Sequence, residues 1–510
     1  MTTHHPDVLV VGAGPAGLAT AISAVTHGAR VLVIERRSGT STVPRATGLG
    51  TRAMEIVREW GLTAEVLTGA IDVDPLIANA DSLTAPVAEE SSIGFPTRRE
   101  SLRVSPAHPV ACPQDHLEPV LVAELRRRGV ELRFGCALTG LEQTAPDGST
   151  ATLADGTRVR ARYVVGADGP RSAVRRALGV EVEELGGWGE WELVLFRGPE
   201  APSRHALWNV DGGVILPAGD GRWLHGRPVP QGDLTAGEWL AGPRALLRRV
   251  TGIADLEPDV LASARFDIGG SVAGTMRVGD VFLIGDAAHR MTPAGGNGLN
   301  TALQDGHELG WRLGWAVRGW AGPTLLASFA EEREPVGRFR ATRSVRSPAA
   351  HAVDGLAGDL GWTYRSATVA SAGTSAGTPW TGPGIEELPA GTHTARPGER
   401  VPHAWVRVDG RRRAVLDLLG PGLTLLTRDP RWEAAATGQA VPVAVPEISD
   451  PSGVLARRLH LGPASAVLVR PDGVVVWRHD AEVSRAALAD AVALAAGRTH
   501  AARSADRTAA

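Results

Sequence analysis

The sequence predicts an α/β protein with an inserted, mostly antiparallel β-sheet and a separate C-terminal domain. Residues 7–35 contain an apolar run, a glycine-rich turn, a helical pattern and a second apolar run, the order of a βαβ unit. Short apolar runs with tryptophan, separated by glycine-rich turns, fill residues 180–270. A Ser-, Thr-, Gly- and Pro-rich stretch at 366–394 precedes a region, 395–497, that has strand and helix patterns of its own.

The composition is that of a folded protein with small-molecule partners. The 510 residues give roughly two to four domains, and 43% hydrophobic with 21% charged residues is ordinary globular usage. A net charge of −3 provides no basic field for nucleic acid or anionic lipid. The start has no basic region before its apolar stretch, and no apolar run reaches about 18 residues. We therefore expect a cytoplasmic protein without a signal peptide or a membrane span.

The chain contains no lysine, so every basic side chain other than histidine is arginine. Schiff-base catalysis and a P-loop lysine are excluded for that reason. The two cysteines, Cys112 and Cys136, are too far apart in sequence for a CxxC motif or a four-ligand zinc site. We expect both to be buried, reduced thiols, and we predict no metal site.

The first motif with chemical meaning is Gly12-x-Gly14-x-x-Gly17, between the first predicted strand and the first predicted helix. In such a turn one glycine makes the bend, one lets a pyrophosphate approach the backbone, and one lets the helix pack on the strand. The helix N-terminus attracts the anion. Glu35, at the end of the second strand, can accept hydrogen bonds from a ribose. The motif predicts a dinucleotide site, for NAD or FAD.

The remaining elements follow from apolar periodicity and capping residues. We predict strands at 7–11, 30–35, 130–134, 158–167 and 281–284, and helices at 17–27, 115–129, 172–178 and 300–319. Trp311 and Trp315 lie on one face of the last helix. Asp168 precedes the 172–178 helix, where it can cap the helix as well as bind a ligand.

Three separated motifs carry a resemblance to a known family. They are VVGAGPAGL followed by VIERR, then VVGADGPRSAVRR at 164–176, and VFLIGDAAHRMTPAGGNGLN at 281–300. In this order they resemble the class A FAD-dependent aromatic hydroxylases, the para-hydroxybenzoate hydroxylase-like flavoprotein monooxygenases. The resemblance implies a Rossmann-like FAD-binding domain, with the inserted sheet as the substrate domain.

The resemblance also implies which residues hold the cofactor. Arg36 and Arg45 would contact the adenosine side and the approach to the flavin, Gln114 the ribityl chain, and Asp286 the ribityl or ribose hydroxyls. Asp168 matches a motif associated with FAD and with the nicotinamide cofactor. The complete predicted set is Gly12, Gly14, Gly17, Glu35, Arg36, Arg45, Gln114, Asp168, Asp286, Pro293, Gly296, Gly298, Leu299 and Asn300.

The segment from Pro293 to Asn300 would lie against the isoalloxazine ring. Its glycines, Gly296 and Gly298 among them, would let a planar ring approach the main chain. Free N–H groups of Leu299 and Asn300 at the following helix N-terminus would stabilise negative charge near flavin N1. The alternative is an ordinary glycine loop before a helix. His289 has a structural rather than a catalytic role by this interpretation. The sequence does not identify a catalytic group, and Arg45, Pro293 and Gly296 are named only as residues next to the flavin.

Four residues of the inserted sheet are substrate candidates: Trp208, Trp223, His225 and Arg227. Aromatic rings stack on planar substrates, although sheet core is the alternative role for each of them. The region from residue 395 resembles the thioredoxin-like extension of the larger family members, which act on phenols and aromatic polyketides. It contains no cysteine, so its role should be structural.

The predicted division of the chain has five parts. They are a discontinuous FAD-binding domain (1–75, 104–180 and 270–345), a substrate domain (76–103 and 181–269), a helix and linker (346–394), a thioredoxin-like domain (395–497) and a flexible tail (498–510). We expect a monomer or a homodimer.

The resemblance implies an FAD-dependent monooxygenase. The all-arginine usage and the abundant Ala and Gly indicate a high-GC genome and, by association, an antibiotic pathway. NADPH or NADH would reduce the flavin, and a C4a-hydroperoxide formed with O₂ would hydroxylate an aromatic or polyketide substrate. Baeyer–Villiger oxygenation, and a redox-neutral FAD protein that sequesters a pathway intermediate, are the alternatives. Flavin-dependent halogenases need a catalytic lysine, which this chain lacks.

Overall fold

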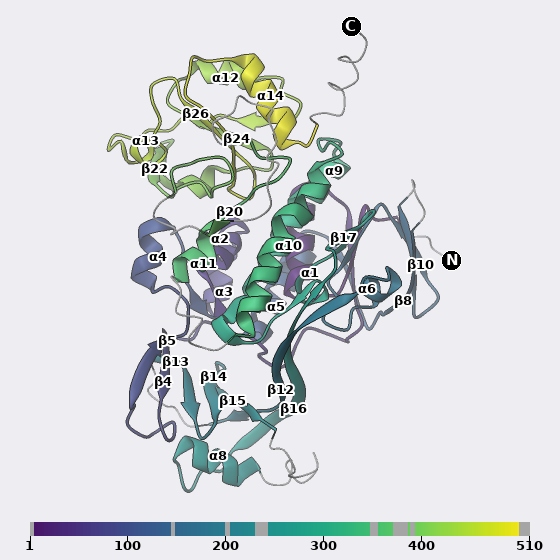
Figure 1. Cartoon of the computed structure of the whole chain (residues 1–510), viewed down its shortest axis with the longest axis vertical. Coiled ribbons are helices and arrows are strands. Elements are labelled where there is room, and N and C mark those ends of the chain that lie inside the picture. Colours follow the sequence, from purple (N-terminus) through teal and green to yellow (C-terminus); the bar gives the residue numbers. More distant parts are fainter. Residues whose placement is uncertain are drawn as a thin grey trace.

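The structure is a computed structural model that describes residues 5–143, 148–198, 204–229, 243–346, 355–370, 386–387 and 393–498. The predicted linker lies mostly, and the predicted tail almost entirely, outside the described residues. Figure 1 shows a central α/β layer, the inserted sheet below it and the C-terminal region above it. Among the described residues, no helix combines the length and the apolarity needed to cross a bilayer.

A six-stranded sheet forms the centre, in the order β17-β18-β11-β1-β2-β7. All neighbours in it pair in parallel except β17 and β18. The strands β1, β2, β11 and β18 are mostly continuous apolar runs, as is typical of a parallel sheet buried on both faces. The bounds are β1 Val8–Val11, β2 Val31–Glu35, β7 Glu131–Phe134, β11 Tyr163–Gly166, β17 Arg277–Val278 and β18 Val281–Leu283.

Two helices, α1 (Pro15–Thr26) and α9 (Asn297–Val317), pack closely beside this sheet. Gly306, Gly310 and Gly314 recur every fourth residue on the α9 face that meets α1. A Cβ atom at Gly306 would lie 2.4 Å from the Ala16 carbonyl oxygen. The absence of side chains at these positions therefore allows the two backbones to touch.

An eight-stranded, mostly antiparallel sheet lies below the centre, in the order β19-β16-β12-β15-β14-β13-β4-β5. Its one parallel pair joins β13 to β4. This confirms the predicted antiparallel insert, to which β4, β5 and β19 add strands from outside residues 180–270. The bounds are β4 Asp74–Asn79, β5 Glu89–Ser92, β12 Val182–Arg197, β13 His205–Val210, β14 Gly213–Pro217, β15 Arg222–Pro228, β16 Asp259–Ala273 and β19 His289–Arg290.

The C-terminal region has a four-stranded sheet, β25-β24-β26-β27. Trp311 and Trp315 of α9 are fully buried and belong to the same hydrophobic cluster as Trp432 and Trp477 of this region. The α9 helix thus carries part of the C-terminal core. The bounds are β22 Trp405–Val408, β23 Arg411–Ala414, β24 Leu423–Thr427, α12 Arg431–Ala436, β25 Val443–Ala444, α13 Val454–Arg458, β26 Ala466–Val469, β27 Val475–His479 and α14 Arg485–Ala495.

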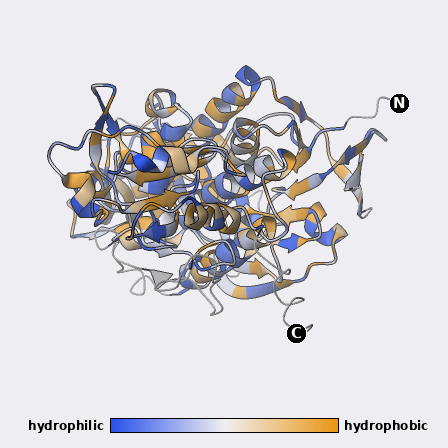
Figure 2. Ribbon diagram, turned by 90° about the horizontal axis from the view of Figure 1, so that it is seen from above, coloured by the Kyte–Doolittle hydropathy of each residue, from blue (hydrophilic) through white to orange (hydrophobic). Residues whose placement is uncertain are grey.

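Two predicted elements differ from the structure. The strand predicted at 158–167 is two strands, β10 (Arg158–Ala161) and β11, which belong to different sheets and are separated at Arg162. The helix predicted from residue 300 begins at Asn297. Hydrophobic and hydrophilic segments alternate along the elements in Figure 2, as amphipathic elements around a core require.

The other elements complete the layers. Their bounds are α2 Thr51–Glu59, α3 Thr63–Leu67, α4 Arg98–Val104, α5 Gln114–Arg127, α6 Ala173–Ala177, α8 Pro243–Thr251, α10 Leu325–Ser344, α11 Gly355–Leu360, β3 Gly48–Leu49, β6 Val110–Ala111, β8 Leu138–Gln143, β9 Ser149–Leu153, β20 Trp362–Thr363 and β21 Glu386–Glu387, with short 3₁₀ turns at Gly285–Ala287, Ala294–Gly296 and Val415–Leu418.

Candidate functional site

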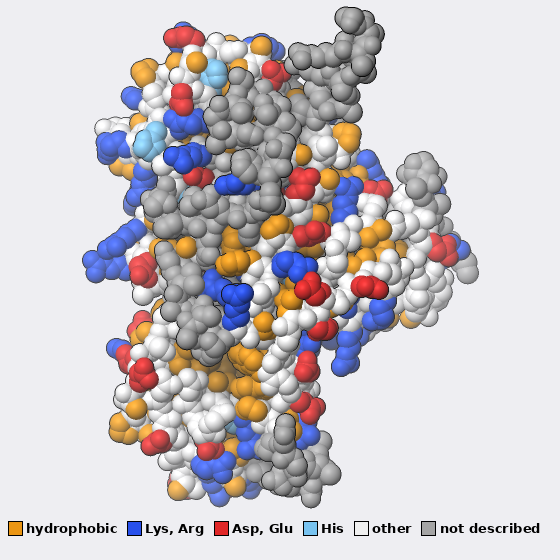
Figure 3. All heavy atoms as spheres, viewed as in Figure 1, with side chains coloured by type: hydrophobic (Ala, Val, Ile, Leu, Met, Phe, Trp, Pro, Cys, Tyr) orange, Lys and Arg blue, Asp and Glu red, His pale blue; other side chains and the backbone are white. Residues whose placement is uncertain are grey.

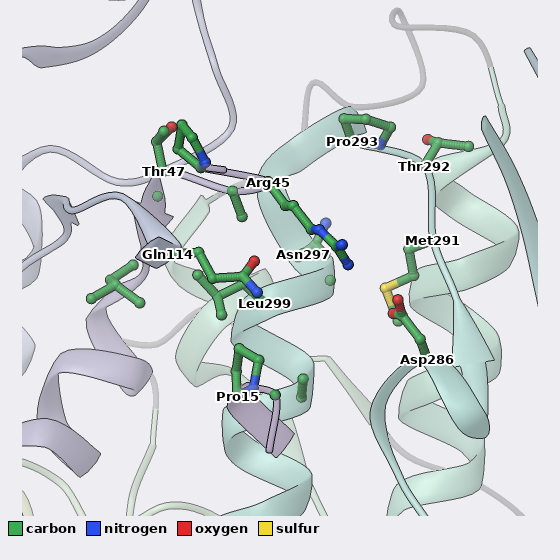
Figure 4. A pocket seen from close by; sticks show the side chains of 18 of the residues that line it. Pro15, Arg45, Thr47, Gln114, Asp286, Met291, Thr292, Pro293, Asn297 and Leu299 are labelled. Carbon is green, nitrogen blue, oxygen red and sulfur yellow. The ribbon is translucent and has the colours of Figure 1, made fainter. Parts of the chain in front are cut away.

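One cavity of about 1500 Å³ joins the central sheet to the inserted sheet. A single drug-sized ligand usually occupies about 300–1000 Å³, so this space admits a dinucleotide and a second molecule. Figure 4 shows its middle part, which is lined by Arg45, Gln114, Pro293, Asn297 and Leu299. The predicted N-terminal turn and the distant 293–299 segment therefore share one cavity.

The glycine turn has the geometry that a dinucleotide loop requires. Gly12 has φ +110°, and a Cβ there would lie 2.2 Å from the Ala167 carbonyl oxygen. A Cβ at Gly17 would lie 1.9 Å from the Gly12 carbonyl oxygen, so this glycine allows α1 to pack on β1. Gly14 lines the cavity, and a Cβ there would meet no atom within 4 Å. Gly12 and Gly17 thus allow the tight bend and the close packing, and the space at Gly14 is open to a ligand.

Glu35 is buried at the end of β2, and its side chain is held in place. Oε2 accepts a hydrogen bond of 2.9 Å from the Ala13 N–H, and Oε1 accepts bonds from the backbone and side chain of Arg37. Burial acts to raise the pKa of Glu35, but the bonds from Arg37 and Ala13 outweigh it and place the pKa below its ordinary value. The ionised carboxylate is ready to accept from a hydroxyl group.

Asp168 both caps α6 and lines the cavity. Oδ2 accepts from the N–H groups of Ala173 (2.6 Å) and Val174 (3.2 Å). Oδ1 is buried and has no partner among the described residues. The helix-capping role considered from the sequence is thus present, and one carboxylate oxygen remains for a ligand.

Two arginines of the predicted set are exposed to the cavity. Arg36 and Arg45 line it, and neither makes a hydrogen bond or ion pair with another described residue. In Figure 4 the Arg45 side chain extends past Asn297 toward Met291 and Asp286. Gln114 also lines the cavity, and its Nε2 donates to Glu118 Oε1 at 2.7 Å. Unpaired arginines of this kind suit a phosphate or another electron-rich group.

Asp286 follows β18 and presents its carboxylate to the cavity. The surrounding protein raises the pKa of Asp286 by desolvation, while His289, Arg290 and Arg45 act in the opposite direction. A carboxyl in this situation gains from a ligand hydroxyl because a hydrogen bond replaces the missing solvent.

The 293–300 segment brings a helix N-terminus to the cavity. Gly295 and Gly296 have φ of +73° and +61°, a backbone conformation that favours glycine, and α9 begins at Asn297. Gly298 and Leu299 line the cavity, and a Cβ at Gly298 would meet nothing within 4 Å. The N–H groups of this first turn have no hydrogen-bond acceptor within the helix. They can therefore stabilise a negative charge on a ligand in the cavity.

Asn300 has a structural side chain, whereas the role predicted for this residue concerned its backbone N–H group. Its Nδ2 donates to the carbonyl oxygens of Gly48 and Gly296, and its Oδ1 accepts from the Gly50 N–H at 2.7 Å. It fastens β3 to the start of α9. His289 is also structural, since its buried Nε2 bonds Asp305 Oδ2 at 2.6 Å.

The four substrate candidates lie on the wrong face of the inserted sheet. Trp208 and Trp223 belong to a buried hydrophobic cluster, His225 is 1% exposed and bonds the Val214 carbonyl, and Arg227 pairs with Glu192. The cavity is lined instead by their neighbours along the strands, because successive side chains of a strand point to opposite faces. The prediction that these side chains line the pocket is therefore corrected.

The residues missed from the sequence form an apolar wall. On the inserted sheet the wall is made by Trp188, Trp191, Leu193, Leu207, Leu216, Leu224 and Phe266, and Phe95 adds a ring from the loop before α4. Figure 3 shows hydrophobic side chains gathered over this part of the molecule. The residues of β14 and β15 that line the cavity are Val214, Leu216, Pro217, Leu224 and Gly226, and none of them is charged.

The residues at the upper end of the cavity fit a dinucleotide. The space at Gly14, the unpaired Oδ1 of Asp168 and the unpaired guanidinium groups of Arg36 and Arg45 each offer an unused contact. Two open glycine positions, Gly14 and Gly298, occur in separate helix N-terminal turns of the cavity. Such a cavity accommodates a pyrophosphate at α1 and a planar ring at α9.

Cys136 offers a test of where the dinucleotide lies. It lines the cavity beside Glu35, whose carbonyl oxygen accepts its N–H at 2.8 Å. Burial raises the pKa of Cys136, and burial raises the pKa of the fully buried Cys112 to about 12. We expect iodoacetamide to label Cys136 slowly at pH 7 and faster as the pH rises, because the thiolate fraction grows. FAD should protect Cys136, and Cys112 should react only after unfolding.

Mass spectrometry of the labelled protein, with and without FAD, measures both rates. Labelling of Cys136 that FAD leaves unchanged would show that the dinucleotide lies elsewhere.

Two family models match the chain. The model of an FAD binding domain matches residues 5–344, and the model of the C-terminal region of aromatic-ring hydroxylases matches residues 394–499. The tetracenomycin B2 monooxygenase-dioxygenase of Streptomyces olivaceus is 33% identical over an alignment 529 residues long, which covers 93% of this chain and 95% of that protein. The aklavinone 12-hydroxylase RdmE of Streptomyces purpurascens is 32% identical and covers 96% of this chain and 98% of its own.

Solved structures give the same result for the fold. A ternary complex of aklavinone-11 hydroxylase with FAD and aklavinone superposes with a TM-score of 0.88 at 31% identity and covers 98% of this chain and 100% of that chain. The flavin-dependent monooxygenase PieE, in complex with FAD and substrate, has a TM-score of 0.85 at 29% identity, with 97% and 99% covered. The predicted α/β architecture with an inserted antiparallel sheet and an added C-terminal domain is thereby confirmed.

Proposed function

The chain belongs to the FAD-binding aromatic-ring hydroxylases, and from this premise we propose that it uses NAD(P)H and O₂ to hydroxylate an aromatic polyketide. One observation carries the proposal. The cavity that contains the glycine turn and the start of α9 continues without interruption into the apolar face of the inserted sheet. A flavin and a flat apolar substrate would then lie in contact.

The shape and chemistry of the apolar wall support a polycyclic substrate. Trp188 and Trp191, with ring centroids 5.9 Å apart, flank the part of the wall nearest β16. Aromatic side chains bind planar rings by offset or edge contacts. The relatives whose names include tetracenomycin and aklavinone are consistent with a fused-ring phenol or quinone of this class.

FAD, when bound, supplies the redox chemistry and the activation of O₂. The chain contributes position and charge. The first-turn N–H groups of α9 face the site where negative charge would develop, and Arg45 would add a positive charge to the same region. The apolar wall excludes water from the reacting atoms, which limits the loss of activated oxygen.

The reductant would approach near the turn after β11. Arg171 and Arg176 are exposed there and line the cavity beside Gly169. Their charges suit the pyrophosphate of a nicotinamide dinucleotide that visits the flavin transiently.

The decisive experiment measures the product formed with ¹⁸O₂ from a panel of phenols and anthraquinones. We expect substrate-stimulated NAD(P)H oxidation and a product that gains one labelled oxygen as a hydroxyl. A lactone carrying the label would indicate Baeyer–Villiger oxygenation instead. Substrate binding without NAD(P)H consumption would indicate a redox-neutral role, and either result would contradict the proposal.

Replacing Arg45 by alanine should weaken FAD binding without destabilising the protein. Arg45 makes no hydrogen bond or ion pair with a described residue that its loss would break. A hydrogen bond to a charged group contributes about 1.5–3 kcal/mol, so the dissociation constant of FAD should rise about tenfold to a hundredfold. Arg30→Ala is the matched control, because Arg30 pairs with Asp7 on the surface and does not line the cavity. Equal FAD affinity of the Arg45 variant and this control, measured by flavin fluorescence, would refute the assignment.

A further inference from the structure

His108 lines the cavity and has no role in the function proposed above. It is the one histidine among the described residues that form the lining, which contains neither tyrosine nor lysine. Its side chain is half-buried, just before β6. Hydroxylation of a phenol is assisted when the phenol loses its proton, because the phenolate ring is richer in electrons. A group that accepts a proton near neutral pH would therefore serve this cavity.

The hydrogen bonds of His108 determine which ring nitrogen is available. Nδ1 lies 2.9 Å from the Pro109 carbonyl oxygen. A carbonyl oxygen only accepts, so Nδ1 carries the hydrogen in this contact. In the neutral ring Nε2 then holds a free lone pair, and it has no partner among the described residues. His108 is thus fixed in the tautomer that can take up a proton at Nε2.

The backbone ladder places His108 near the ring end of the cavity rather than its adenosine end. Two residues further along, Val110 pairs with Leu49, and Ala111 pairs with Gly48. The Gly48 carbonyl oxygen accepts from the side chain of Asn300 on α9, at 3.0 Å. A Cβ at either Gly48 or Gly296 would contact the Phe95 ring at 2.7 Å, so β3, the start of α9 and the apolar wall meet here.

Several other ionisable groups of the lining are less suited to this task. Glu35, Glu118 and Asp168 already accept N–H groups, and Asp267 pairs with Arg290. Burial raises the pKa of the Cys136 thiol, which therefore stays protonated at neutral pH. An imidazole has its ordinary pKa nearer to neutral pH than a carboxylate does, which favours it as a general base.

We propose that His108 is the general base that accepts the phenolic proton of the substrate, an assignment that rests on the proposed function. The substrate O–H bond breaks and an N–H bond forms at Nε2. The electron pair stays on the phenolic oxygen, and the imidazole becomes an imidazolium. The proton then passes to water when the product leaves.

Charged groups lie on several of the elements around His108. Asp359 lies against Gly50 at the end of β3, and Glu55 accepts from Ser105 while it pairs with Arg52 and Arg400. These groups include Arg52, Glu55, Asp72, Asp74, Arg98, Arg99, Glu100, Arg103, Asp359 and Arg400. Substitutions at His108 leave all of them in place.

The test compares wild-type holoenzyme with His108→Gln and His116→Gln. His116 is a half-buried histidine of α5 outside the cavity lining, and its Nε2 bonds the Glu65 carbonyl oxygen. With the best phenol of the ¹⁸O₂ panel, H108Q should lower kcat at pH 7 about a hundredfold. Its rate should recover as the pH approaches the pKa of the free phenol. FAD affinity and thermal midpoint should not change, and H116Q should behave as wild type.

A second measurement needs no turnover. Alizarin changes colour on ionisation, and its difference spectrum on the oxidised enzyme reports the pH at which the bound phenol loses its proton. This pH should rise by about one unit or more in H108Q. If H108Q loses FAD or its fold, His108→Asn serves in both measurements.

Unchanged pH dependence in both measurements, with an active wild type, would overturn the role of His108 alone. A wild type that hydroxylates no phenol would instead overturn the proposed function.

Discussion

Gly306→Val is expected to lower the free energy of unfolding substantially. Gly298→Ala, eight residues earlier in the same helix, is expected to weaken only FAD binding. A Cβ at Gly306 would lie 2.4 Å from the Ala16 carbonyl oxygen and 2.7 Å from the Ala19 Cβ, and backbone cannot move aside without moving α1. Overpacking of this kind costs about 1–3 kcal/mol or more. Ala16 belongs to the glycine turn, so FAD affinity should fall as well.

Gly298 is the matched control because its Cβ would meet no atom of the protein within 4 Å. Alanine there gains up to about 1 kcal/mol of helix propensity. The added methyl would occupy cavity space where the ring is proposed to lie, so the FAD dissociation constant should rise about tenfold or more. Denaturant unfolding of the apoprotein and FAD titration separate the two effects. A Gly298→Ala variant with unchanged FAD affinity would remove the ring from this place.

Glu332→Gln should cost about 3–5 kcal/mol, since it breaks a fully buried ion network. Glu332 accepts from Arg312 of α9 and, through both oxygens, from Arg470 of the C-terminal region, with Nη–Oε distances of 2.7 and 2.9 Å to the latter. Asp472 also pairs with Arg470. All four side chains are buried. Without the negative charge of Glu332, the positive charges of Arg312 and Arg470 are buried with too few carboxylates to balance them.

The same ion network determines how the stability of the protein changes as the pH falls. Burial acts to raise the pKa of Asp472, but Arg470 and Arg312 outweigh it and lower the pKa to about 2. The pKa of Glu332 is lowered by the same two arginines against its burial. The stabilisation is therefore complete above the unfolded-state pKa of about 4 and is lost as the pH falls toward 2. Urea unfolding from pH 7 to pH 3 should show a weaker pH dependence for Glu332→Gln.

Glu142→Gln provides the comparison for this experiment. Glu142 and Arg158 form an ion pair in which both side chains are mostly exposed, and such pairs contribute about 0–1 kcal/mol. Equal losses for the two variants would show that the buried network does not hold the C-terminal region in place.

The sequence predicted the elements whose signal is local. The βαβ unit could be read because strand, glycine turn and helix follow one another without interruption, and Gly12, Gly14 and Gly17 each have the predicted environment. The break at Arg162 could not be predicted, because both halves of 158–167 are good strand sequence and only the pairing partners differ.

The remaining errors concern information that is not local. Trp223 and Leu224 are both apolar, so the alternation along β15 did not show which one faces the cavity. The partnership of Glu332 and Arg470 joins residues far apart in the chain, and charge pattern alone does not identify such pairs. His108 was not predicted either, because its proposed role as a base depends on a tautomer that is fixed by one carbonyl oxygen.

The two tryptophans of α9 determine how the chain can be divided for engineering. Trp311 bonds Asp472, and Trp315 bonds the Pro421 carbonyl oxygen, from within a helix whose first turn belongs to the cofactor cavity. In a chimera whose junction lies between residues 346 and 393, Trp311 and Trp315 would contact a C-terminal region from another protein. Successful exchange of the C-terminal region would thus require the far end of α9 to be redesigned with it, as one module.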